Sequence, residues 1–232
     1  MAVRVQPRQL AFALPHAESL TRDNFLEGPA NEAALALIES WPDWPNRIML
    51  LVGPEGAGKS HLAAIWAARA HAWTIDVAEV AGERVPHLVS NGALVIEDAD
   101  RAERDEAALF HLLNLARERG CYLLLTSAVP VERWGLGTPD LLSRLRLAPS
   151  AALEPPDDAL LKSVLVKLFV DRQLVVDTSV IDYLALRIER SLARAGEVVA
   201  ALDREALSRR RRVTRAMAAE LVGQGGGEEE ID

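Results

Sequence analysis

The most specific chemistry in this chain is carried by GPEGAGKS, residues 53–60, which combines three glycines with a lysine and a serine. Gly53, four further residues and then Gly58-Lys59-Ser60 have the spacing of a P-loop, in which backbone N–H groups cradle phosphate oxygens. In such a loop the lysine reaches the β- and γ-phosphates and the serine hydroxyl coordinates Mg²⁺. We therefore expect a nucleotide phosphate chain here, contacted by Pro54, Glu55, Gly56, Ala57, Gly58, Lys59, Ser60 and His61.

Two pairs of polar residues follow apolar runs further along the chain. Glu97 and Asp98 end LVIED, and they suit a Walker B element in which the first acid holds Mg²⁺ and the second orients the attacking water. Alone, two acids after a strand usually form a solvated loop, but beside a P-loop a chemical role is favoured. Thr126 and Ser127 end LLLTS, where we expect Ser127 to sense the γ-phosphate; a plain strand end explains these two residues equally well.

Two arginines complete the candidate site. Arg144 in DLLSRL lies near the end of an expected helix, where an exposed guanidinium can stabilise charge on the nucleotide of a neighbouring subunit. The alternative role for Arg144 is a surface salt bridge. Arg204 in AALDREAL could cap the nucleotide from the opposite side.

The elements that must position these residues alternate along the first two thirds of the chain. Continuous apolar runs predict strands at 47–53, 72–77, 92–99, 121–127 and, more weakly, 148–153. Helical patterns lie between them, at 31–41, 61–72, 105–120 and 139–145, and Asn31 is the expected cap of the first helix. This alternation predicts the α/β class, a parallel sheet between helices.

The pattern changes at EPPDD, after which only helices are expected, at 157–171, 178–188, 194–211 and 214–222. We therefore divide the chain into four parts. They are an extended N-terminal segment (1–20), an α/β nucleotide-binding domain (21–155), a small all-α lid (156–222) and a disordered glycine-rich, acidic tail (223–232).

Composition restricts the function classes. The chain has 26 basic and 34 acidic residues and a net charge of −8, which disfavours phosphate-driven DNA binding; we expect no direct sequence-specific contact with DNA. The basic run SRRRRVTR at 208–215 is interpreted as complementing a helix macrodipole. A single cysteine and the absence of a long apolar stretch predict a cytoplasmic protein without a membrane span.

The order of these features, over residues 20–222, resembles that of the AAA+ ATPases, and more narrowly that of the DnaA family. The segments that carry the narrower resemblance are DNFLEGPANEAALALI (23–38), DEAALFHLLNLARERG, LLTS, LEPPDD and ALDR. The resemblance implies that Phe25, Leu26 and Asn31 frame an adenine ring. It also implies that Arg204 is the sensor 2 residue of the lid and that Arg144 is an arginine finger acting in trans.

Within that family the chain resembles the Hda-type members, which keep the AAA+ module and lack the DNA-binding domain. Those proteins carry an N-terminal peptide that binds the β sliding clamp of DNA polymerase. In RQLAFALP (8–15) the polar Gln9 and the apolar Leu10, Phe12 and Leu14 match such a peptide. The resemblance implies two partners, the clamp and DnaA, and an activity that stimulates hydrolysis of DnaA-bound ATP and thereby restrains replication initiation.

Two positions depart from the DnaA pattern: Glu97 replaces the usual aspartate, and Ala128 follows LLTS where an aspartate is common. They predict weak or no ATPase activity of the chain itself, with ADP or ATP and Mg²⁺ held at the P-loop. The alternatives are an autonomous ATPase of helicase-loader or clamp-loader type, and a non-catalytic adaptor that carries a structural nucleotide. Self-association into a homo-oligomer is compatible with either.

Overall fold

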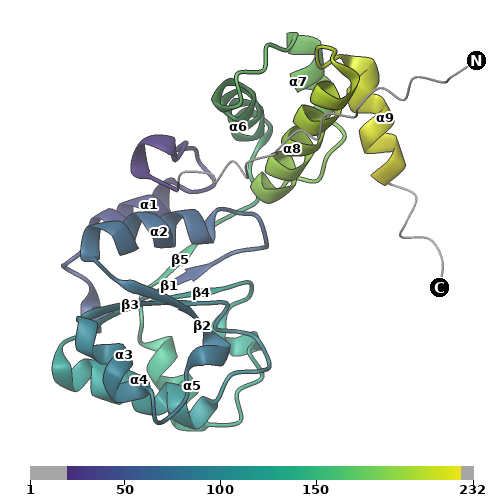
Figure 1. The fold of residues 1–232 in the computed structure, drawn as a ribbon. Coiled ribbons are helices and arrows are strands. Elements are labelled where there is room, and N and C mark those ends of the chain that lie inside the picture. The colour runs from purple at the N-terminus through teal and green to yellow at the C-terminus, as the bar shows by residue number, and fades with distance from the viewer. Residues whose placement is uncertain (1–19, 226–232) are drawn as a thin grey trace, which may run out of the picture.

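A five-stranded parallel sheet forms the centre of the first domain (Figure 1). The computed structural model describes residues 20–225, so the clamp-type peptide at 9–14 and residues 226–232 of the tail lie outside the described residues. The strand order is β2-β3-β4-β1-β5, and every neighbouring pair is parallel. The strands are β1 (Ile48–Val52), β2 (Trp73–Asp76), β3 (Ala93–Glu97), β4 (Tyr122–Ser127) and β5 (Ser150–Ala152).

Helices cover both faces of this sheet, as the apolar strand runs predict. Along β3, Ala93 and Val95 pack into a core with α1 and α2, whereas Leu94 and Ile96 pack into a second core with α4. Side chains alternate between the two faces of a strand, so a strand buried on both faces must be apolar throughout. The helices are α1 (Glu32–Glu39), α2 (Lys59–Ala70), α3 (Val85–Leu88), α4 (Glu106–Arg119) and α5 (Pro139–Arg146).

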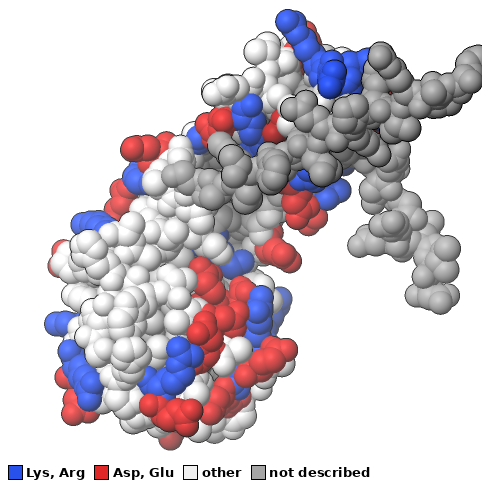
Figure 2. All heavy atoms as spheres, viewed as in Figure 1, with Lys and Arg blue, Asp and Glu red and all other residues white. Residues whose placement is uncertain are grey.

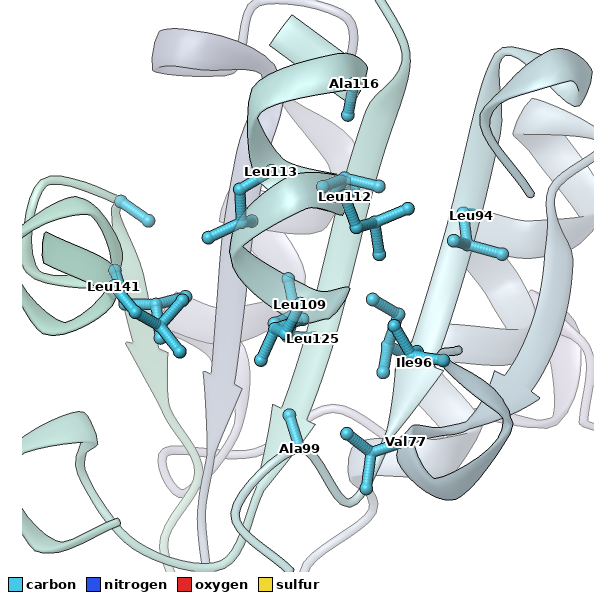
Figure 3. Packing of buried hydrophobic residues seen from close by; sticks show 14 of the residues in the cluster. Val77, Leu94, Ile96, Ala99, Leu109, Leu112, Leu113, Ala116, Leu125 and Leu141 are labelled. Carbon is cyan, nitrogen blue, oxygen red and sulfur yellow. The ribbon is translucent and has the colours of Figure 1, made fainter. Parts of the chain in front are cut away.

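The core beneath α4 anchors the strands that carry the acids. Leu109 and Leu112 of α4 point toward Leu125 of β4 and toward Leu94 and Ile96 of β3 (Figure 3). All five side chains are fully buried. Close packing of this kind fixes β3 and β4 side by side and therefore fixes the polar residues at their carboxyl ends.

The lid is a bundle of four helices with its own apolar core, which includes Phe169, Leu184 and Leu202. Its helices are α6 (Asp158–Asp171), α7 (Thr178–Ala185), α8 (Leu192–Arg209) and α9 (Arg215–Gly225). Asp157 caps α6, since its carboxylate accepts a 2.7 Å hydrogen bond from the backbone N–H of Leu160. None of the described helices combines the length and the apolar character that crossing a membrane requires.

The sequence predicts which helices are present better than it predicts where each helix begins and ends. Helix α9 continues to Gly225, three residues into the segment expected to be disordered, because it packs against α7 and α8. Helix α7 ends at Ala185, not at 188, and the four-residue α3 is not predicted, since so short a segment shows no periodicity.

Candidate phosphate and nucleotide site

The P-loop joins the carboxyl end of β1 to the first turn of α2, and its conformation needs glycine. Gly56 and Gly58 have φ values of +72° and +103°, in the left-handed region that glycine tolerates. A Cβ atom at Gly53 would lie 2.5 Å from the carbonyl oxygen of Leu153, which follows β5. These constraints turn the backbone of the loop toward the N-terminus of α2, where N–H groups and the helix dipole favour an anion.

A cavity of about 580 Å³ lies beside this loop. It is open to solvent and receives residues from the P-loop, from the loops that follow β3 and β4, and from the start of α8 in the lid. Its lining residues are Leu20, Glu55, Gly56, Gly58, Lys59, Ser60, His61, Asp98, Asp100, Arg101, Ala128, Leu192 and Ala193.

The ammonium group of Lys59 is held inside the P-loop. Its Nζ donates to the carbonyl oxygens of Gly53 at 2.7 Å and of Pro54 at 3.0 Å, and the residue is 9 % exposed. These acceptors are neutral carbonyls, so the positive charge of Lys59 has no carboxylate bonded to it among the described residues. A phosphate group in the cavity would therefore meet an uncompensated cation at the base of the loop.

Glu97 and Ser60 lie close enough to share a cation. Oγ of Ser60 is 3.5 Å from Oε2 of Glu97, and Oγ1 of Thr126 donates to the same oxygen at 2.5 Å. Burial raises the pKa of Glu97, and the hydrogen bond from Thr126 opposes that rise. A hydroxyl and a carboxylate oxygen suit Mg²⁺, which usually takes few protein ligands and fills its remaining positions with phosphate and water. The described residues contain no group of three or more His, Cys, Asp or Glu that could hold a metal alone.

The structure places Thr126, not the predicted Ser127, beside Glu97. Thr126 lies on the same face of β4 as Leu124, the face covered by α2, and it also accepts a 2.9 Å hydrogen bond from the backbone N–H of Asp98. Ser127 lies on the opposite face with Leu125; it is fully buried and its hydroxyl has no partner among the described residues. The alternation of apolar residues along β3 and β4 is the sequence signal that separates the faces of Thr126 and Ser127.

Asp98 is engaged by an arginine that the sequence does not single out. Its Oδ2 lies 2.6 Å from Nη2 of Arg101, whose Nη1 lies 2.8 Å from Oδ2 of Asp76. Asp98 has a φ of +53°, and both it and Arg101 line the cavity. The ion pair compensates the carboxylate expected to orient a water. The i,i+3 spacing of the two residues is the only local hint of this pair.

Next to these acids, the loop after β4 depends on Asp100. Its Oδ2 accepts hydrogen bonds from the backbone N–H groups of Ala128 at 2.9 Å and Val129 at 3.2 Å. Ala128 itself lines the cavity with its small side chain.

The segment expected to frame adenine lies against the P-loop. The Phe25 ring is 6 % exposed and meets the His61 ring edge to face at 5.1 Å, and Nε2 of His61 is 2.9 Å from the carbonyl oxygen of Thr21. Leu26 is half-buried beside them. Of these three residues His61 lines the cavity, whereas Phe25 and Leu26 lie behind it and are absent from the lining.

Asn31 supports this segment from behind. It precedes α1, as expected of a cap, but its side chain makes no capping hydrogen bond. Instead Oδ1 accepts from the N–H of Gly28 at 2.9 Å and Nδ2 donates to the carbonyl oxygen of Leu26 at 3.0 Å. Because Asn31 is 2 % exposed with both ends of its amide engaged, it shapes the turn and presents no group to a ligand.

The lid touches the P-loop directly. The backbone N–H of Leu192, the first residue of α8, donates to the carbonyl oxygen of Gly56 at 2.8 Å. A Cβ at Gly56 would lie 1.9 Å from Oγ of Ser191 and 3.2 Å from Cβ of Ala193. The phosphate loop and the lid therefore share one contact surface, which the sequence does not reveal.

The structure does not bring Arg204 to the cavity. Arg204 is exposed, is absent from the lining, and lies twelve residues after Leu192, about 18 Å further along α8. The physical reason is the direction of α8, which begins at the P-loop and leads away from it (Figure 1).

Arg144 also lies away from the cavity, on α5. Its guanidinium carbon is 5.2 Å from the centre of the Phe110 ring on α4, and among residues 20–225 it forms no ion pair. Two residues later, Arg146 pairs with Glu132 at 3.1 Å. The surface salt bridge that was the alternative role for Arg144 is therefore formed by Arg146 instead.

Comparisons with known proteins place the fold. No protein-family model matches the sequence, and no curated protein matches it. Domain III of the Thermotoga maritima replication initiation protein DnaA superposes with a TM-score of 0.75 at 20% identity, over 88% of this chain and 96% of that one. AMPPCP-bound DnaA from Aquifex aeolicus gives 0.67 at 18% identity, over 82% of this chain and 69% of that one. A Thermotoga maritima RuvB mutant gives 0.70 at 16% identity, over 89% and 72%.

The chain therefore has the AAA+ P-loop α/β fold, which confirms the predicted fold class. Within that class its fold is like that of DnaA domain III and of RuvB. At these identities the likeness concerns the fold alone.

Proposed function

We propose that this chain is a DnaA-related AAA+ regulator of the Hda type. It binds ADP or ATP with Mg²⁺ at the P-loop, docks on the β sliding clamp through Gln9, Leu10, Phe12 and Leu14, and stimulates hydrolysis of DnaA-bound ATP. This activity restrains replication initiation. The likeness to DnaA structures, one of them bound to AMPPCP, supports the nucleotide and the replication context. The clamp-binding part rests on the sequence pattern alone.

The cavity residues support nucleotide binding. The N–H groups of the P-loop and the ammonium of Lys59 would bind the phosphate oxygens, and Ser60 and Glu97 would hold Mg²⁺, which neutralises phosphate charge when bound. The His61 ring, which lines the cavity and is backed by the Phe25 ring, would lie beside the base. Leu192, bonded to Gly56, keeps the lid against the loop that grips the phosphates.

The single observation that carries the trans-acting role is the state of Arg144. Its guanidinium lies over Phe110, has no acidic partner among the described residues, and is remote from the chain's own cavity. A cation in that position cannot contact the nucleotide of its own chain. Because no acid of the described residues is paired with it, the phosphate of a partner could approach it without displacing another group. Placed beside the γ-phosphate of DnaA-bound ATP, it would stabilise the charge that develops during phosphoryl transfer, an effect worth about 10³- to 10⁵-fold in rate.

One observation favours the nucleotide-bound adaptor as a second candidate. Asp98, the acid suited to orient a water, is paired with Arg101, and this pairing disfavours turnover by the chain itself. An adaptor would need the nucleotide only to hold the lid in place. Unlike the proposed regulator, such an adaptor would act equally well when Arg144 is replaced.

The test measures ATP hydrolysis by purified DnaA with DNA-loaded clamp, with and without this chain. Stimulation should require the clamp and should be lost in Gln9→Ala/Leu10→Ala. Arg144→Ala should lower the stimulated rate by roughly a thousandfold, or to background, with clamp binding unchanged. Arg146→Ala is the matched control, since Arg146 lies on the same helix but is already paired with Glu132.

The remaining outcomes select the alternatives. Full stimulation by Arg144→Ala would sink the arginine-finger assignment and leave the adaptor. An unchanged DnaA rate, together with ATP hydrolysis by this chain alone that Lys59→Ala abolishes, would identify an autonomous ATPase.

A further inference from the structure

The basic run at 208–215 begins in the last turn of α8 and continues beyond the end of that helix. Helix α8 ends at Arg209, and Arg210 is its C-terminal cap with a φ of +53°. The N–H of Arg210 donates to the carbonyl oxygen of Leu207 at 3.2 Å, and that of Arg211 donates to Ala206 at 3.1 Å. The backbone itself provides donors to two carbonyl groups at the end of the helix, so the side chains of residues 210–212 are not needed as hydrogen-bond donors there.

Arg209, the last residue of α8, is engaged by two acids. Arg209 pairs with Glu205 at 2.5 Å and with Glu220 at 2.7 Å. In contrast, Arg210, Arg211 and Arg212 are exposed, and within residues 20–225 they form no ion pair. Three guanidinium groups are therefore gathered at one turn without an ion pair among the described residues.

These arginines border a groove of about 490 Å³ at the end of the lid. Figure 2 shows basic side chains at the end of the lid farthest from the sheet, where α8 joins α9 in Figure 1. The opposite wall is the turn after α6, which is fixed by the N–H of Leu174 donating to the carbonyl oxygen of Phe169 at 2.8 Å. The lining residues are Gln173, Leu174, Val175, Asp203, Ala206, Leu207, Arg210, Arg211, Arg212 and Val213.

The groove floor is apolar and exposed. Val175 is 83% exposed and Leu207 is 62% exposed, whereas Val213 is buried and anchors the arginine turn in the lid core. Asp203 is the one carboxylate in the lining, against three arginines. A fitting ligand carries several negative charges and one apolar side chain. The lining offers no aromatic ring on which a nucleic-acid base would stack, which favours a peptide.

The chain contains such a peptide. Residues 228–232 read EEEID, four carboxylates and an isoleucine, and they follow a glycine-rich stretch, GQGGG, at 223–227. Helix α9 starts three positions after Arg212 and spans 11 residues, or about 16 Å. Ile231 is six residues after Gly225, and six extended residues reach about 20 Å, enough to return along α9 to the groove.

We propose that this groove binds the acidic segment 228–232 of the same chain, with Ile231 against Val175 and Leu207 and the carboxylates beside Arg210, Arg211 and Arg212. The segment competes there with any other acidic peptide. A glycine linker of this length keeps it at a high effective concentration, so modest contacts suffice.

The experiment titrates a labelled synthetic peptide, residues 224–232, into full-length protein and follows fluorescence anisotropy at low ionic strength. The receptor is the variant Glu228→Gln/Glu229→Gln/Glu230→Gln, whose own segment has lost three charges. The peptide should bind this variant at least about tenfold more tightly than it binds the wild type, where the native segment competes.

Two changes in the groove, each added to that receptor, should weaken peptide binding. They are Arg210→Gln/Arg211→Gln/Arg212→Gln, by about tenfold, and Leu207→Ser. The control Arg187→Ala changes a lid arginine outside the groove and should have no effect. Circular dichroism establishes that each variant is folded.

Four outcomes would overturn the proposal. They are no binding to the charge-neutralised variant, equal binding to variant and wild type, indifference to the arginine substitutions, and equal binding of a peptide carrying Ile231→Ser. Competition in the wild type that appears only at concentrations where light scattering detects dimers would assign the segment to a second copy. Arginine-dependent binding of a labelled single-stranded oligonucleotide that is tighter than binding of the peptide would assign the groove to nucleic acid. Either of these two results would also overturn the proposal.

Discussion

The two sides of the nucleotide cavity satisfy their charged groups in different ways. On the P-loop side, the partners of Lys59 among residues 20–225 are neutral carbonyl oxygens of its own loop. On the acid side, Glu97 accepts a hydrogen bond from Thr126, and Asp98 pairs with Arg101, which it shares with Asp76. A phosphate chain thus finds an available cation on one side, while the acid suited to activate water is engaged on the other. The difference teaches that the groups suited to bind phosphate and the group suited to activate water are held independently in one cavity, in line with a proposed regulator that holds a nucleotide.

The largest effect should come from the P-loop side. Lys59→Ala removes the only buried cation of the cavity among the described residues, and a charge-assisted hydrogen bond to phosphate contributes up to about 3 kcal/mol. We expect affinity for ADP and ATP to fall roughly a hundredfold, measured by titration calorimetry. Lys162→Ala, at an exposed lysine of the lid that pairs with Asp182, is the control and should bind normally. Retained affinity in Lys59→Ala would show that the loop backbone alone binds the phosphates. The available cation would then not distinguish the P-loop side from the acid side.

A second, smaller effect tests the contact between the P-loop and the lid. Gly56→Ala forces a side chain into a φ of +72° and toward Oγ of Ser191 at 1.9 Å, so the lid must shift. We expect a loss of about 2 kcal/mol of unfolding free energy, measured by denaturant unfolding, with weaker nucleotide binding. Gly82→Ala is the matched control, because a Cβ there meets nothing within 4 Å. An equal, small loss in both variants would mean that the lid is not held by the loop.

The fold and the phosphate loop could be predicted from the sequence because both depend on local patterns. Continuous apolar runs define buried parallel strands, and the spacing from Gly53 to Ser60 defines the P-loop. The structure confirms the sheet between helices and the helical lid.

What the sequence does not predict are the pairings between elements. Choosing Thr126 over Ser127 requires knowing which face of β4 meets α2, although both residues end the same strand. The distance of Arg204 from the cavity depends on the direction in which α8 leaves the P-loop. The pair of Asp98 and Arg101 depends on a turn with a positive φ, which aspartate adopts more readily than most residues but does not require.

The smallest effect should come from the acid side and should have the opposite sign. Arg101→Ala releases Asp98, which then becomes available to accept a hydrogen bond from the attacking water. We expect ATP hydrolysis by the chain alone to rise about threefold to fivefold, because a solvent-exposed ion pair contributes only modestly. Steady-state phosphate release measures this rate, with nucleotide affinity determined in parallel.

Two further variants make the result decisive. Arg84→Ala removes another exposed arginine that pairs with an acid, Glu79, and it should leave the rate unchanged. Arg101→Ala/Asp98→Asn should lose the gain, because the released carboxylate, and not the lost positive charge, produces it. If the single variant gains nothing while nucleotide affinity falls, Arg101 binds the phosphates directly.

The acid side would then resemble the P-loop side in offering a cation to the phosphates. The weak ATPase activity expected of this chain would then be explained by Glu97, whose longer side chain would displace the cation it shares with Ser60.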